Sequence, residues 1–216
     1  YATEQSKNYY RQYDGCDDFL ISDKLINGIW DFFNYKIMNL SDLGNENIPA
    51  TVSVLHTNSG AGKILEKAPN NTTLFAYNLD YVCKKITDIL CQDKSKEGNY
   101  FSKIRDISEY YIARETNNSR KYDIVITQPM PNMTFYRGVD CNDELTSQEP
   151  LEYYMKRSLD FVEENGFLVV IYSPDKEEDI KVFSKKLKLN IHHIIKVKEL
   201  DNIGYQSIIL SKNKKQ

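Results

Sequence analysis

A glycine-rich turn that follows a short apolar segment is the first place where residue types and spacing suggest ligand chemistry. Residues 51–55 are interpreted as a short buried strand, and Ser59-Gly60-Ala61-Gly62 follow it shortly after His56. Because Gly60 and Gly62 carry no side chain, backbone approaches a ligand closely there, and the amides that open the next helix attract anionic groups. The pattern predicts a ligand site, although the same glycines also suit a plain tight turn.

Two phosphate-binding turns do not fit this segment. A P-loop requires GxxxxGK followed by Ser or Thr, but Ile64 follows Gly62-Lys63, and Thr57 stands at the first glycine position. A dinucleotide-binding fingerprint needs a third glycine, and Leu65 stands there instead. The segment resembles the shorter glycine turn of class I methyltransferases, in which amides meet the amino-acid end of S-adenosylmethionine.

Strand-like and helix-like segments alternate around this turn. Apolar spacing predicts helices over 23–37, 62–68, 80–91, 109–114, 150–165 and 175–187, and strands over 51–55, 73–79, 100–107, 122–126 and 167–172. Gly166 is expected to close the helix over 150–165 as a left-handed cap. Two final β-rich runs, 191–197 and 205–210, read as an antiparallel hairpin. The pattern predicts one α/β domain with a doubly wound, seven-stranded, mostly parallel sheet that ends in an antiparallel hairpin.

Composition and charge narrow the function. The chain has 216 residues, of which 41% are hydrophobic, and 28 Lys+Arg against 31 Asp+Glu give a net charge of −3, so it lacks the basic field of a self-sufficient nucleic-acid binder. The four cysteines are far apart without a CxxC pair, which argues against a zinc knuckle and a disulfide framework, and no metal site is expected. No long apolar segment or signal-like start is present, which predicts a cytoplasmic protein that does not enter the membrane.

Four segments, taken in order, resemble the N6-adenine DNA methyltransferases, including the methylation subunits of type I restriction systems. VLHTNSGAGKIL from Val54 resembles their first motif, VLDPxxGxG, and LFAYNLD from Leu74 resembles their second strand. YDIVITQPMP from Tyr122 resembles FDxIxxNPPY, and LDFVEENGFLVVIYSP from Leu159 resembles the helix and strand that follow it. The resemblance covers about residues 20–212 and implies the Rossmann-like class I methyltransferase fold, with S-adenosylmethionine as cofactor.

The resemblance also assigns cofactor-binding positions, and two of them depart from the family. His56 stands where the family has an acidic residue, and Asn78 stands where a carboxylate grips the ribose hydroxyls. The implied cofactor site consists of His56, Asn58, Gly60, Gly62, Asn78, Asp80 and Asp106. Asp80 is also explained as a helix cap, and Asp106 as an exposed loop carboxylate. Charge-assisted hydrogen bonds are stronger than neutral ones, so the departures predict weak cofactor binding.

The implied catalytic segment departs further. In the family, an Asn amide and the following carbonyl accept hydrogen bonds from the amine of a flipped adenine, and an aromatic residue stacks on the base. Here those places hold Gln128, Pro129 and Pro131, and Phe135 or Tyr136 is the alternative stacking residue. A displacement of about 1 Å at a reacting centre costs of order a hundredfold in rate. Catalysis is therefore an open question for this chain.

Two functional hypotheses follow. The first is a diverged S-adenosylmethionine-dependent DNA methyltransferase of the N6-adenine group, and the second is a catalytically inactive relative that acts in binding or assembly. Methylation of RNA, protein or a small molecule is a third reading. Residues 1–45 are interpreted as an N-terminal extension and helix, and residues 46–216 as the methyltransferase-like domain. DNA contact is expected through a separate specificity subunit or domain, and hence through a protein partner.

Overall fold

The computed structural model describes residues 21–41, 51–78, 81–105, 120–129, 150–197 and 205–212, with the backbone alone over 35–41 and at 150. The expected boundary between residues 45 and 46 lies outside these ranges. Across the described residues, no helix combines the length and apolar character that crossing a membrane requires.

Seven strands form one sheet in the order β3-β2-β1-β4-β5-β7-β6. Neighbouring strands from β3 to β5 are parallel, whereas β7 pairs antiparallel with both β5 and β6. This arrangement confirms the predicted seven-stranded, mostly parallel sheet with its C-terminal antiparallel hairpin. The strands are β1 (Val52–His56), β2 (Thr72–Asn78), β3 (Tyr100–Ile104), β4 (Tyr122–Thr127), β5 (Val162–Tyr172), β6 (Leu189–Ile195) and β7 (Gln206–Lys212).

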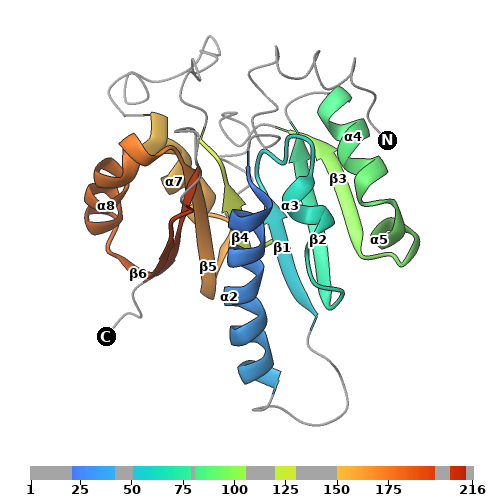
Figure 1. The fold of residues 1–216 in the computed structure, drawn as a ribbon, viewed down its shortest axis with the longest axis horizontal. Helices are drawn as coiled ribbons and strands as arrows, with labels where there is room; N and C mark the ends of the chain where they lie inside the picture. The colour runs from blue at the N-terminus through green and yellow to red at the C-terminus, as the bar shows by residue number, and fades with distance from the viewer. Residues whose placement is uncertain are drawn as a thin grey trace.

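Helices cover both faces of the sheet. In Figure 1, α2 crosses the front of the sheet, β3, α4 and α5 lie at one edge, and α8 and β6 lie at the other. Helix α7 contacts β4, β5 and α8. The described helices are α2 (Asp23–Ser41), α3 (Lys63–Glu66), α4 (Tyr81–Leu90), α5 (Gln92–Lys96), α7 (Pro150–Leu159), the 3-10 turn η4 (Pro174–Lys176) and α8 (Glu177–Lys186).

The central strands are apolar on both sides because helices pack on both sides. Alternate residues of β1 divide between two cores: Val54 packs with the α2 side of the sheet, and Leu55 packs with the α7 side. The apolar run of β5 is split in the same way, with Val169 on the first side and Val170 on the second. These two cores hold the strand ends in fixed relative positions, which a site built on three strands requires.

Helix α2 is joined directly to the segment after the glycine turn. Its first turn is capped by Ser22, whose Oγ accepts from the Leu25 amide at 3.3 Å, as expected for a serine N-cap. The Trp30 indole donates to the Ile64 carbonyl at 3.0 Å, and Lys63 Nζ donates to the Ile21 carbonyl at 2.7 Å. These bonds fix α3, and with it the end of the glycine turn, against α2.

The expectation for Gly166 was wrong. Helix α7 ends at Leu159, and β5 already begins at Val162, so Gly166 lies inside a strand rather than at a helix C-cap. The β4–β5 pairing is irregular between Tyr122 and Ile124, where β5 contains more residues than β4. A Cβ at position 166 would lie 2.8 Å from the Asp123 carbonyl oxygen, so this glycine permits the close approach of two strands.

Candidate functional site

Three neighbouring strands, β2, β1 and β4, end at the same edge of the sheet and carry most of the predicted site residues. In open α/β sheets, ligands bind outside the carboxyl ends of the strands, near the point where strand order reverses. That point is here between β1 and β4, because the chain order runs outward to β2 and β3 on one side and to β4 and β5 on the other. His56 and Asn78 are the last residues of β1 and β2.

The glycine turn adopts a conformation that requires glycine. Gly60 and Gly62 have φ values of 50° and 77°, in the left-handed region that L side chains rarely occupy. The Ser59 amide donates to the Tyr77 carbonyl at 2.8 Å, and the Gly62 amide donates to the Ser59 carbonyl at 2.7 Å. Gly62 therefore contributes shape rather than a spare amide, because its own N–H is used within the turn.

Thr87 on α4 packs against the glycine turn, and the sequence motifs did not identify it as part of the site. Its Oγ1 lies 2.9 Å from the Gly60 carbonyl oxygen and 3.2 Å from Asn78 Oδ1, and the residue is fully buried. A Cβ on Gly62 would lie 2.5 Å from Thr87 Cγ2. A signal was present in the sequence, since Cys83, Thr87 and Cys91 share a four-residue spacing, which places all three on one helix face.

The two polar atoms of the Asn78 side chain differ, because the oxygen contacts hydroxyl groups and the nitrogen has no partner among the described residues. Its Oδ1 faces two hydroxyls, Ser59 Oγ at 2.8 Å and Thr87 Oγ1 at 3.2 Å. Its Nδ2 is buried and finds no hydrogen-bond partner in the described part of the chain. An unpaired buried donor costs free energy, about 1–3 kcal/mol, so this nitrogen marks a position where a ligand oxygen would be stabilising.

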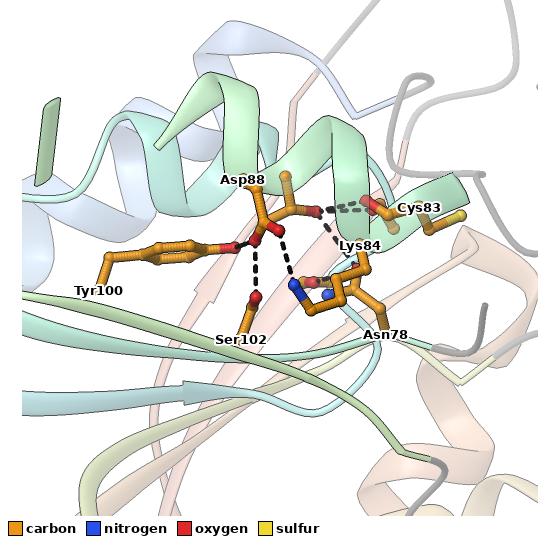
Figure 2. Close-up of polar contacts among 9 residues, drawn as sticks. Asn78, Cys83, Lys84, Asp88, Tyr100 and Ser102 are labelled. Carbon is orange, nitrogen blue, oxygen red and sulfur yellow. Dashed lines mark hydrogen bonds and ion pairs between the residues drawn. The ribbon is translucent and has the colours of Figure 1, made fainter. Parts of the chain in front are cut away.

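Helix α4 also fixes the edge strand β3 through the residue next to Thr87. Figure 2 shows Asp88 facing Tyr100 and Ser102 of β3, whose hydroxyls donate to Asp88 Oδ1 at 2.9 and 2.6 Å. Lys84 lies one helical turn earlier and pairs with Asp88 Oδ2 at 2.6 Å. Although partial burial raises it, these donors together keep the pKa of Asp88 below its usual value. Through Thr87 and Asp88, α4 ties the glycine turn to β3.

His56 is a fully buried imidazole at the end of β1. Neither ring nitrogen has a hydrogen-bond partner among the residues that the structure describes. Burial lowers the pKa of His56 to about 3, so the ring is neutral at pH 7. The position that holds a negative charge in the family therefore holds an uncharged ring here.

The burial of His56 predicts acid sensitivity. The pKa of His56 is lower in the folded than in the unfolded chain, so its contribution to stability is complete above about pH 6.5 and is lost as pH falls toward 3. Between pH 7 and pH 4 this contribution decreases by roughly 3 kcal/mol. We expect urea unfolding to show that loss in the wild type, beyond the loss in His56→Leu. Carboxylates whose pKa is lowered in the folded state, such as Asp88, also contribute less to stability at low pH, but this loss is the same in both proteins. Equal pH dependence of the two proteins would contradict the prediction.

Asn58 contacts the segment after β4 rather than only the glycine turn. Its Oδ1 accepts from the Gln128 amide at 3.1 Å, and its Nδ2 donates to the Gln128 carbonyl. Both residues are 4% exposed. These two bonds place the predicted catalytic segment, Gln128-Pro129, beside the predicted cofactor turn.

The structure thus brings together His56, Asn58, Gly60, Gly62, Asn78 and Gln128, with Pro129 directly following. The other three predicted site residues, Asp80, Asp106 and Pro131, lie outside the described residues. Within the described ranges, no group of three or more His, Cys, Asp or Glu residues is arranged to hold a metal ion. Cys83 and Cys91 are both buried.

Sequence comparison and structure comparison give different results. No family model and no curated protein matches the sequence. An S-adenosylmethionine-dependent methyltransferase from Clostridium acetobutylicum has a similar structure over 98% of this chain and 100% of its own, with a TM-score of 0.57 and 13% identity. An rRNA methylase from Streptococcus thermophilus matches over 83% and 95%, with a TM-score of 0.50 and 10% identity. A tRNA methyltransferase from M. jannaschii matches over 83% of this chain and 49% of its own, with a TM-score of 0.53 and 17% identity.

The resemblance in four sequence segments and the similarity in three dimensions point to the same architecture. The chain has the Rossmann-like fold of the class I S-adenosylmethionine-dependent methyltransferases.

Proposed function

We propose that this chain binds S-adenosylmethionine over the glycine turn and methylates the N6 amine of adenine in DNA. One observation carries the proposal: hydrogen bonds join the glycine turn to Asn78 on one side and, through Asn58, to Gln128 on the other. Methyl transfer needs a cofactor turn, a ribose contact and an amine-binding segment within one ligand's length. The sequence resemblance assigns these three roles to the same three segments.

The residues present fit the cofactor. Gly60 offers backbone without a side chain, and the unpaired Nδ2 of Asn78 offers a donor to a ribose hydroxyl. His56 is neutral at pH 7 and does not repel a cation. When bound, S-adenosylmethionine supplies an electrophilic methyl group on a sulfonium. The side-chain amide oxygen of Gln128 and the backbone carbonyl of Pro129 are proposed to accept hydrogen bonds from the substrate amine. These bonds would turn the lone pair of the amine toward the methyl group.

A second candidate function is a non-catalytic, methyltransferase-like binding or assembly subunit. It is favoured by Asn78, because the oxygen that would accept from a ribose hydroxyl already faces Ser59 and Thr87. Target recognition is proposed to come from a separate specificity subunit or domain, since the described residues form only the sheet and its covering helices. DNA is the proposed substrate, and RNA is the alternative substrate to be tested in the same methyl-transfer assay.

Calorimetry with S-adenosylmethionine tests the proposal. We expect a dissociation constant above the submicromolar range in the wild type, and about tenfold tighter binding in Asn78→Asp, because a carboxylate restores a charge-assisted bond to the ribose. Asn78→Ser removes the amide without adding charge and serves as the matched control. Absence of binding at millimolar cofactor would leave the non-catalytic function. Unchanged affinity in Asn78→Asp would show that Asn78 does not contact the ribose.

A further inference from the structure

The β1–β4 ladder ends at Ile126, two residues before Gln128, where the predicted catalytic segment begins. The last paired residues are His56 and Ile126, and the Thr57 amide adds one more bond to the Ile126 carbonyl at 2.9 Å. Beyond this point β1 turns away into the glycine turn, so no strand residue of β1 remains to pair with Gln128. An unpaired backbone group at this depth would cost the full desolvation of a buried donor and acceptor.

The side chain of Asn58 replaces the missing strand residue. A carboxamide carries one acceptor and one donor group, like a peptide unit, and Asn58 uses both on the same residue: Oδ1 accepts from the Gln128 amide at 3.1 Å, while Nδ2 donates to the Gln128 carbonyl. The Thr57 hydroxyl lies 3.3 Å from the same Oδ1 and 3.0 Å from Thr127 Oγ1. It therefore helps to hold the side-chain amide of Asn58 next to β4. Pro129 has no N–H, so Gln128 is the last residue before it that offers β1 a full pair of backbone groups.

We propose that Asn58 is a positioning residue that ties the glycine turn to the Gln128-Pro129 segment and couples the two. Asn58 lies two residues before Gly60, within the turn that the cofactor would occupy. Any ligand that orders the turn therefore also orders the backbone of Gln128 and Pro129, which carries the Gln128 side chain and the Pro129 carbonyl. The catalytic consequence of this coupling rests on the proposed function, whereas the physical link between the two segments does not.

Hydrogen exchange of the Gln128 amide measures the link without any ligand. This amide donates to Asn58, so Asn58→Ala is expected to lower its protection factor at least tenfold beyond the change in global stability. Thr72→Val is the matched control, because it removes a buried hydroxyl on β2 that donates to the Pro69 carbonyl and contacts neither Asn58 nor Gln128. We expect its Gln128 protection to stay within threefold of the wild type. Unchanged protection in Asn58→Ala would overturn the proposal.

Asn58→Asp gives a second readout that a role in packing alone does not produce. Its volume matches that of asparagine, so it avoids the cavity of the alanine variant. The carboxylate accepts from the Gln128 amide but repels the Gln128 carbonyl, whereas the protonated acid donates and accepts as the amide does. Burial raises the pKa of a carboxyl at this position, so the acid form gains population toward pH 5. Gln128 protection in Asn58→Asp, taken relative to the wild type at the same pH, is therefore expected to rise at least fivefold from pH 8 to pH 5. A flat profile would contradict the proposal.

Addition of S-adenosylmethionine separates this inference from the proposed function. In the wild type, saturating cofactor is expected to raise Gln128 protection at least threefold, and in Asn58→Ala this increase is expected to vanish even where the cofactor still binds. Equal increases in both proteins would overturn the coupling. If the wild type binds no cofactor, the proposed function fails, and exchange in the free protein still decides whether Asn58 holds Gln128.

Discussion

Gly62→Ala is expected to lower the free energy of unfolding by about 4 kcal/mol. Two costs add at this position: a left-handed conformation, with φ of 77°, costs an L residue about 1–2 kcal/mol, and overpacking costs about 1–3 kcal/mol. The overpacking arises because the new Cβ would lie 2.5 Å from Thr87 Cγ2 and 3.0 Å from Thr87 Cβ. Urea denaturation, analysed by linear extrapolation, measures the effect.

The chain offers a matched control for this substitution. Gly98 has φ of 74°, nearly the value of Gly62, but a Cβ there would meet no atom within 4 Å. Gly98→Ala is therefore expected to show the conformational cost alone, and its difference from Gly62→Ala measures the contact with Thr87. Thr87→Ser removes Cγ2 and is expected to recover part of the loss in the double variant. Equal destabilisation by Gly62→Ala and Gly98→Ala would show that the turn relaxes away from α4.

Gln128→Ala is expected to lower methyl transfer at least about a hundredfold if the chain is an active adenine methylase. The side-chain amide is the proposed acceptor for the substrate amine, and loss of one such preorganised group typically costs a factor of 10² to 10³ in rate. Cofactor affinity is expected to change less than threefold, because Asn58 holds Gln128 through its backbone. Transfer of tritiated methyl groups to unmethylated DNA, with RNA in parallel, measures the rate.

The double variant Gln128→Asn with Pro131→Tyr controls this assignment. It restores the shorter amide and the stacking aromatic of the family pattern, and we expect it to transfer methyl groups faster than the wild type. A fast wild type whose rate is unchanged in Gln128→Ala would contradict the role of Gln128. Cofactor binding without transfer in every variant would favour a missing DNA-recognition partner.

Sequence periodicity predicted most of the fold because the central strands of the sheet are buried on both faces. Apolar runs such as 122–126 and 167–172 have no other stable place than a covered sheet, and the intervening helices read clearly from their spacing. Two local features escaped this reasoning. The apolar period predicts a helix end at Gly166, because a glycine after an amphipathic run usually marks one, whereas the close approach of β4 is what requires glycine there. The short helix α5 has no buried residue and therefore left no apolar period.

The sequence by itself located the ends of β1, β2 and β4 to within one residue, because strand ends and glycine turns are local features. It placed His56, Asn78 and Gln128 at one edge of the sheet through the resemblance in order and spacing. What these side chains do there depends on partners distant along the chain, which no local pattern encodes. Asn78 faces Ser59 and Thr87, and Asn58 faces Gln128 across 70 positions. Only the tertiary structure decided that Asn58 completes the ladder of β4, because hydrogen-bond partners are fixed by packing and not by sequence separation.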